Sequence, residues 1–357
     1  MTDATGNTLD LHESYVNIDK LVGAPVSLRV GRQELAYGDQ RLIGSFGWSN
    51  NGRSFDALKF AVTSEPANVD LFTAKISEAA GKDQDFYGLY ATIKAIPSNT
   101  VDFYILSLRD NSKGTAATAM VSNNTTAATI ATGGIIKQQN LNTYGLRLNG
   151  GLTGIDYTVE GAIQTGQIEN ATTKYKMNGR AFAAKAGYTL TAPVKIRVGA
   201  EYDYASGDKD AADNKLTTFF NLFPTNHDKL GYMDYQAWRN VKAFNLNVKA
   251  DVTSDLSLYA GYWNFKLANK ADAWYGAATW NTTATGTLRA ASSTNTASDI
   301  GSEIDLVVSY KYNPAVTVDL GYSTFKAGKY VKNNVAAVAG SDKADSTWAF
   351  LQLTAKF

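Results

Sequence analysis

Two-faced strands recur along this chain and constrain its fold more than any other feature. From Val194 to Tyr204, apolar or tyrosine side chains alternate with Lys195, Arg197, Gly199, Glu201 and Asp203. Alternation with a period of two places the two kinds of side chain on opposite faces of a β-strand. About fifteen segments of this kind occur in 357 residues, and one soluble core cannot cover them without helices or a second sheet. A transmembrane β-barrel can, with its apolar face in lipid and its charged face around water.

Composition agrees with an all-β barrel and excludes other classes. No run reaches the roughly 18 apolar residues of a membrane helix, although 44% of the residues are hydrophobic. Cysteine is absent, which excludes disulfide and thiolate chemistry. The net charge is +1, and basic residues are interleaved with acidic ones, so we expect no binding of nucleic acid.

The C-terminal segment orients the predicted barrel. Residues 346–357 alternate and end on Phe357, a pattern that resembles the C-terminal insertion signal of bacterial outer-membrane barrels. If Phe357 lies at the periplasmic rim, connections counted backwards should alternate between short and long. Short turns rich in Gly, Pro, Asn, Asp or Ser are predicted near 20–25, 64–68, 96–100, 150–154, 191–194, 252–255 and 312–315. The long extracellular loops of this single 1–357 domain are predicted near 36–52, 110–140, 207–237, 268–299 and 326–345.

Fifteen strands follow from this division of the chain, an odd number where bacterial barrels normally have an even one. They are predicted at 9–19, 25–35, 53–64, 68–77, 85–95, 101–109, 141–150, 154–166, 175–190, 194–206, 238–251, 255–267, 301–312, 315–325 and 346–357.

Three segments carry a family resemblance. The stretch LRVGRQELAYGDQRLIGSFGWSNNGRSFDALKF from Leu28 to Phe60 resembles the signature of the alginate export outer-membrane porin family. So do FFNLFPTNHDKLGYMD from Phe219 to Asp234 and LDLHESYVNID from Leu9 to Asp19. The resemblance implies an 18-stranded barrel, and we expect the chain to contain its last fifteen strands without the first three. It also implies a location in the bacterial outer membrane.

Strand parity assigns charged side chains to the face of the pore. The basic ones are Arg29, Lys59, Arg109, Arg147, Lys185, Lys195, Arg197, Lys249 and Lys311. The acidic ones are Asp156, Glu160, Glu201, Asp203, Asp251, Glu303, Asp305 and Asp319.

Two clusters allow more than one interpretation. The signature segment concentrates the charges Arg32, Glu34, Asp39, Arg41, Arg53 and Asp56. They form either a salt-bridged clasp that fixes a loop, or guanidinium forks that face the carboxylates of a passing uronate polymer. The second cluster, 219–224, either folds its loop over the mouth as a lid or stabilises that loop through a small hydrophobic cluster.

Enzyme chemistry has little support. Only His12 and His227 are present, so a metal cluster or a Ser-His-Asp relay would depend on one of them. The acidic run from Asp208 to Asp213 lacks the glycine and the closing glutamate of a calcium loop. We therefore predict neither catalysis nor a bound metal or cofactor.

The sequence thus predicts a passive outer-membrane channel whose contacts are lipid and an anionic polysaccharide such as alginate. Export would require supply machinery in the periplasm, because such a pore has no intrinsic direction. Two alternatives remain. One is a general diffusion porin that also admits small anionic solutes; the other is a scaffold that captures a partner with its loops 110–140, 207–237 or 268–299.

Overall fold

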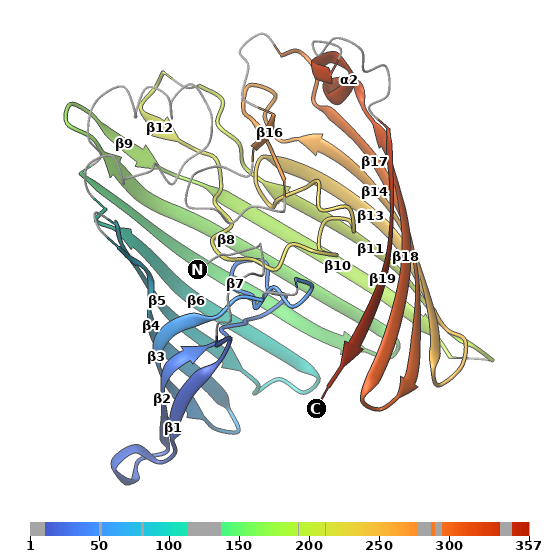
Figure 1. The fold of residues 1–357 in the computed structure, drawn as a ribbon, viewed down its shortest axis with the longest axis horizontal. Helices are drawn as coiled ribbons and strands as arrows, with labels where there is room; N and C mark the ends of the chain where they lie inside the picture. The colour runs from blue at the N-terminus through green and yellow to red at the C-terminus, as the bar shows by residue number, and fades with distance from the viewer. Residues whose placement is uncertain are drawn as a thin grey trace.

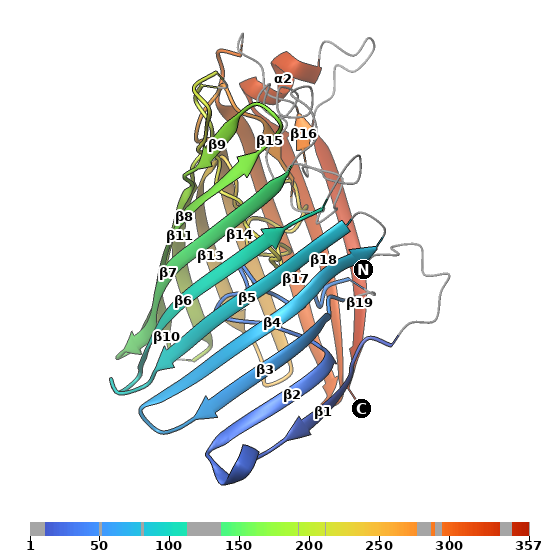
Figure 2. The same cartoon turned by 90° about the vertical axis from the view of Figure 1, so that its left-hand side faces the viewer.

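One large antiparallel sheet forms the body of the protein (Figures 1 and 2). The computed structural model describes residues 11–49, 52–79, 82–112, 137–191, 193–210, 212–276, 287–289, 295–335 and 345–356. The long strands are β1 (Ser14–Ile18), β2 (Val26–Gln33), β3 (Phe55–Thr63), β4 (Ala67–Ala79), β5 (Lys82–Ile93), β6 (Asn99–Asp110), β7 (Gln138–Leu152), β8 (Ile155–Glu169), β10 (Arg180–Leu190), β11 (Lys195–Ala205), β13 (Val241–Asp251), β14 (Leu256–Leu267), β17 (Asp299–Asn313), β18 (Val316–Ala327) and β19 (Ser346–Ala355). Each pairs antiparallel with the next in this order.

These fifteen strands correspond to the fifteen predicted ones; most bounds differ by one to three residues, and two differences are larger. The strand predicted at 175–190 is divided into β9 (Lys174–Met177) and β10. The strand predicted at 9–19 begins at Ser14, and the part before residue 11 lies outside the described residues.

The connections alternate in length as predicted, except that only residues 80–81 separate β4 from β5 and only residues 170–173 separate β8 from β9, at the end where the other connections are long. Short turns join β3 to β4, β5 to β6, β7 to β8, β10 to β11, β13 to β14 and β17 to β18, and a 3-10 helix (Leu21–Gly23) lies between β1 and β2. The long connections at the opposite end hold β12 (Lys215–Leu216), β15 (Trp274–Tyr275), β16 (Thr287–Arg289) and the helix α2 (Lys329–Val335) (Figure 1). Most of the predicted loop 110–140 lies outside the described residues. In the described part of the chain, no helix is long and apolar enough to cross a membrane.

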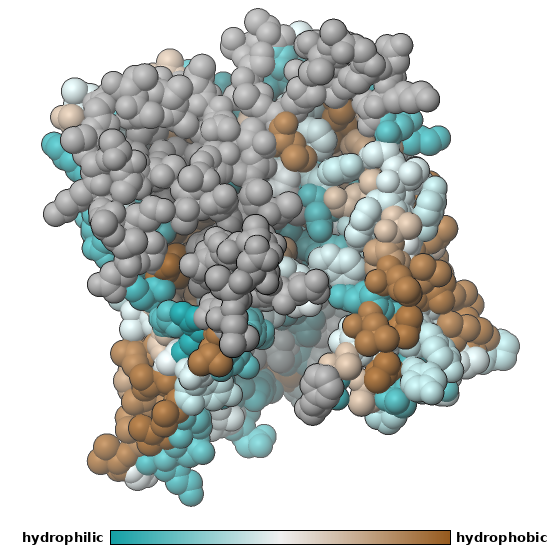
Figure 3. Space-filling view, viewed as in Figure 1, coloured by the Kyte–Doolittle hydropathy of each residue, from teal (hydrophilic) through white to brown (hydrophobic). Residues whose placement is uncertain are grey.

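Burial along the strands is inverted relative to a water-soluble protein. On β17, Glu303 and Asp305 are fully buried, whereas Ile304 and Leu306 are 44% and 48% exposed. Figure 3 shows hydrophobic side chains gathered along the outer flanks of the sheet. Apolar side chains face outward and charged ones inward in a barrel that lipid surrounds. We call these two sides of the sheet its outer and inner faces.

Two segments between strands lie against the inner face. Segment 34–49 follows β2, and segment 206–240 connects β11 to β13; both cross the hollow of the sheet in Figures 1 and 2. Phe223 of the second segment packs edge-on against Phe55 and Phe86, with ring centroids 5.6 and 4.8 Å apart. These buried rings belong to a hydrophobic core enclosed by the sheet. Apolar side chains therefore occur on both faces of several strands.

Replacing Leu246 by Arg tests the assignment of the outer face. Leu246 lies midway along β13 and is 50% exposed. An arginine facing the middle of a bilayer costs about 2–4 kcal/mol, and urea unfolding in lipid vesicles measures this loss. The control is Ser257→Arg on the inner face of β14, for which the expected change is below about 1 kcal/mol. Equal destabilisation by the two substitutions would contradict the assignment.

Candidate functional site

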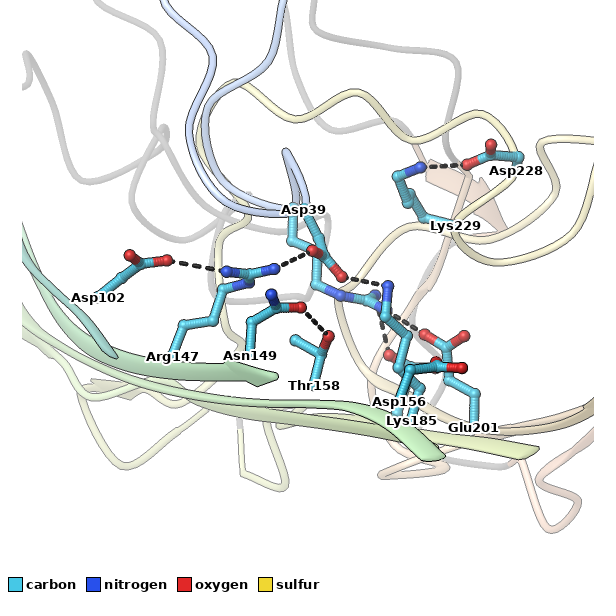
Figure 4. A network of polar contacts seen from close by, with 12 residues as sticks. Asp39, Asp102, Arg147, Asn149, Asp156, Thr158, Lys185, Glu201, Asp228 and Lys229 are labelled. Atoms are coloured by element: carbon cyan, nitrogen blue, oxygen red, sulfur yellow. Dashed lines mark hydrogen bonds and ion pairs between the residues drawn. The ribbon is translucent and has the colours of Figure 1, made fainter. Parts of the chain in front are cut away.

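Asp39 ties segment 34–49 to the inner face. Its carboxylate accepts a hydrogen bond of 2.6 Å from Arg147 on β7 and one from Lys185 on β10 (Figure 4). Arg147 also donates to Asp102 on β6 at 2.9 Å. Burial alone would raise the pKa of Asp39, but the cations Lys185 and Arg147 lower it to about 2. Asp39 is therefore a carboxylate at neutral pH, held between two cations from different strands.

Arg41 makes a second, more deeply buried contact. Its side chain is 3% exposed and pairs with Glu201 and with Asp203 on β11, the latter at 2.9 Å. Its guanidinium also lies over the ring of Trp238. Burial lowers the pKa of Arg41, but the two carboxylates outweigh burial and raise it above its ordinary value. Arg41 is thus a fixed charge in this pair.

Arg53 joins the two inner segments. Its Nη1 donates to the carbonyl oxygens of Gly44, Phe223 and Pro224 at 3.0, 2.5 and 2.8 Å. A parallel bridge between Ile43 and Phe223 lies beside these bonds. Burial lowers the pKa of Arg53 to about 10. The two segments are consequently bonded to each other as well as to the sheet.

The remaining signature charges lie at the margin of this site. Arg32 on β2 donates two hydrogen bonds to Asp56 on β3, at 2.8 and 3.0 Å. Glu34 contacts His12 at 2.8 Å. The six signature charges are therefore engaged within the protein, and contact of their arginines with a passing polymer remains a prediction.

Many of the predicted pore-lining cations have acidic partners. Arg197 donates to Asp156 at 2.6 and 2.8 Å, and Lys59 lies 3.4 Å from Asp70. Lys195 and Lys249 share Asp251, at 3.5 and 3.9 Å. Three cations have no acidic partner among the described residues: Arg109 donates to Asn142, Arg29 lies over the Tyr15 ring, and Lys311 is exposed.

The predicted acidic residues all lie on strands, and their partners belong either to the sheet or to the inner segments. Glu160 accepts a hydrogen bond from Tyr104 at 2.8 Å. Glu303 accepts one from the backbone of Met233 at 2.9 Å, which attaches segment 206–240 to β17. Asp305 and Asp319 accept bonds from the hydroxyl groups of Ser323 and Ser309.

Sequence reasoning missed several participants. Asp102 has the same parity as the buried Tyr104 and Leu106 on β6, so apolar neighbours concealed its inward direction. Gln164 exchanges two hydrogen bonds with the backbone of Phe220; a single glutamine carries no comparable signal. For residues 219–224, the structure has Phe219 and Phe223 buried in the enclosed core.

The comparisons with known proteins identify the family. A family model described as alginate export matches residues 1–345. The chain belongs to this alginate export family. The family match confirms the resemblance of the signature segments, and it makes the chain an outer-membrane porin of the bacterial outer membrane.

Solved structures show the same barrel fold. OprD from Pseudomonas aeruginosa is 12% identical, with a TM-score of 0.55 over 92% of this chain and 75% of that chain. OccK5 (OpdH) and OccK11 (OpdR) from the same organism have TM-scores of 0.54 and 0.53 at 8% and 11% identity. The match to OccK5 spans 94% of this chain and 79% of OccK5. The match to OccK11 spans 93% of this chain and 78% of OccK11. No curated protein sequence matched. The all-β transmembrane barrel predicted from the strand pattern is confirmed.

Arg41→Met should destabilise the family member strongly, because it leaves buried carboxylates without their cation. The expected loss is about 3–5 kcal/mol, measured by urea unfolding in vesicles, and adding Asp203→Asn should recover part of it. The matched control is Arg32→Met in the same signature segment. The Arg32–Asp56 pair is 33% and 56% exposed, so its loss should cost no more than about 1 kcal/mol. Equal effects at the two positions would show that burial of the Arg41 contact does not matter.

Asp208 makes the stability of segment 206–240 depend on pH. Burial raises the pKa of Asp208 from 3.8 to about 6, and Asp272 contributes to the rise. Between these values the folded protein binds the proton more tightly than the unfolded chain, so stability should fall as pH rises from about 4 to 6. The melting temperature of the wild type should therefore fall, relative to that of Asp208→Asn, as the pH rises through this range. The control Asp210→Asn should show the same fall as the wild type. A difference between wild type and Asp208→Asn that is independent of pH would refute this.

Proposed function

We propose that the porin is a passive channel for an anionic polysaccharide, with alginate as the cargo. The carboxylate of Asp39 between Arg147 and Lys185 is the observation that supports this most directly. A uronate residue carries the same carboxylate, and guanidinium and ammonium groups bind carboxylates through charge-assisted hydrogen bonds. The inner face therefore presents a contact suited to the repeating group of such a polymer.

Exchange of carboxylates is the proposed mode of passage. A uronate that takes the place of Asp39 satisfies Arg147 and Lys185 and releases segment 34–49 from this contact. Asp102 is also bonded to Arg147, and an acid at this position would weaken the hold on a passing anion. Weak, repeated contacts favour conduction because the solute must leave each site as readily as it enters. Outward flow then requires a periplasmic supply of polymer.

A general diffusion porin is the second candidate. The pairing of Arg197, Lys59 and Lys195 with acids leaves little net charge on that part of the inner face. Weak ion selectivity follows from balanced charge.

Recordings from planar bilayers separate the candidates. The reversal potential under a salt gradient reports ion selectivity, and added uronate oligomers report block of the conductance. A polyuronate channel is anion-selective and blocked in proportion to oligomer concentration, whereas a general porin is neither. An absence of conductance would instead favour the scaffold whose loops capture a partner.

Asp39→Asn sharpens this test, because it removes the internal carboxylate that competes with the cargo. We expect greater anion selectivity and block at about tenfold lower oligomer concentration, the scale of a hydrogen bond to a charged group. Asp56→Asn is the control, since it changes the same residue type in the same signature segment at the exposed Arg32 contact. Unchanged selectivity and block in Asp39→Asn would contradict the exchange.

A further inference from the structure

Arg239 carries a buried guanidinium near the end of segment 206–240, two residues before β13 begins. It is 7% exposed. Its Cζ lies 4.2 Å from the ring centroid of Tyr275 and 5.0 Å from that of Phe220. Aromatic faces attract the cation, but they supply no acceptor at the edge of the guanidinium plane, where its five N–H groups point.

The nearby carboxylate does not supply that acceptor either. Asp272 accepts hydrogen bonds at one oxygen from the backbone of Asp208 and the hydroxyl of Thr218, and at the other from Ala273 and Tyr275. Two bonds at each oxygen fill the acceptor positions of a carboxylate. In the described part of the chain, no hydrogen bond or ion pair reaches the Arg239 guanidinium, and its Nε is buried without a partner.

Other donors in the stretches that hold Arg239 and Tyr275 show the same deficit. Gln236 Nε2 and Trp238 Nε1 in the same stretch are buried without an acceptor, as is Trp274 Nε1 on β15. The two stretches are joined by a hydrogen bond of 2.9 Å from Ala237 to Tyr275. Buried polar groups in proteins nearly always have partners, and an unpaired one indicates a missing water, ion or ligand. Arg239 Nε is such an atom, and it is a donor.

We propose that Arg239 is the centre of an anion site that binds the carboxylate group of a ligand. A carboxylate matches the planar guanidinium fork with two parallel hydrogen bonds and neutralises its charge. Water would satisfy single donors but add no negative charge beside the buried cation, which Asp272 compensates only in part. A cation is excluded by the guanidinium itself.

This site shares no residue with the Asp39 contact and does not depend on the cargo proposed above. The carboxylate belongs either to a uronate of a polymer in the channel or to a free small carboxylate. Both present the same group to Arg239, so the two sources are distinguished by the ligand used in the test.

The test is an equilibrium titration of the folded protein in detergent, followed by tryptophan fluorescence, with acetate exchanged for chloride at constant sodium. Trp238 and Trp274, which are next to Arg239 and Tyr275 in the sequence, provide the signal. Wild type should respond saturably to acetate, and Arg239→Met should bind at least about tenfold more weakly. Methionine preserves much of the side-chain volume and removes an unpaired buried charge, so this variant is expected to fold. Arg180→Gln, at an exposed arginine of β10, is the control and should bind like wild type.

Tyr275→Phe provides a second variant. It retains the ring over Arg239 but frees one acceptor position of Asp272, which Arg239 then occupies in place of the ligand. Acetate should therefore bind more weakly to this variant too. No saturable response in wild type, or equal binding by wild type and Arg239→Met, would overturn the proposal.

Two further ligands identify the source of the carboxylate. Tighter saturable binding of a uronate oligomer than of acetate indicates the polymer, provided that a neutral glucose oligomer gives no response; equal binding indicates a free carboxylate. Acetate binding without block of the conductance by uronates would support the Arg239 site and contradict the proposed cargo. Block of the conductance by uronates without acetate binding would support the proposed cargo and contradict the Arg239 site.

Discussion

Compensation of charge inside the sheet is the constraint on which the rest of the structure depends. The outer face is apolar because it meets lipid, and strand alternation then places the charged side chains inside. An unpaired charge in that enclosed space is strongly destabilising. Arg41 neutralises Asp203, and Asp39 joins Arg147 to Lys185. The segment after β2 therefore belongs to the charge balance of the sheet, even though it is a connection between strands.

The same constraint bears on transport. A channel whose cations were all free would bind a polyanion tightly, and one whose cations were all neutralised would not distinguish it from other solutes. In the proposed mechanism Asp39 lies between these extremes, because another carboxylate would replace its bonds to Arg147 and Lys185. Arg197, held by two bonds to Asp156 on a neighbouring part of the sheet, contributes less net attraction. Selectivity in the proposed mechanism depends on which internal pairs a passing carboxylate can replace.

The strands, their order and the family could be predicted from the sequence, because alternation and turn chemistry are local properties. The partners of Asp39 and Arg41 could not, since Arg147 and Glu201 lie more than a hundred residues away. Strand parity also fails where the inner segments cover the sheet: Leu106 and Leu108 face inward against the enclosed core and make β6 apolar on both faces. The acceptor deficit of Arg239 depends on four separate bonds to Asp272, and no pattern in one dimension encodes it.

The two inner segments are linked in a way that limits how either can move. Arg53 holds the carbonyl groups of Phe223 and Pro224, and Thr225 donates to the side chain of Gln40 at 2.8 Å. Because these bonds join the two segments, neither segment can leave the inner face by itself without breaking them. The attachment of segment 206–240 to β17 through Met233 and Glu303 thus restrains the Asp39 contact across the hollow of the sheet. In the proposed mechanism, release of segment 34–49 from Arg147 is therefore coupled to the contacts of segment 206–240, which ends at Asn240 beside Arg239.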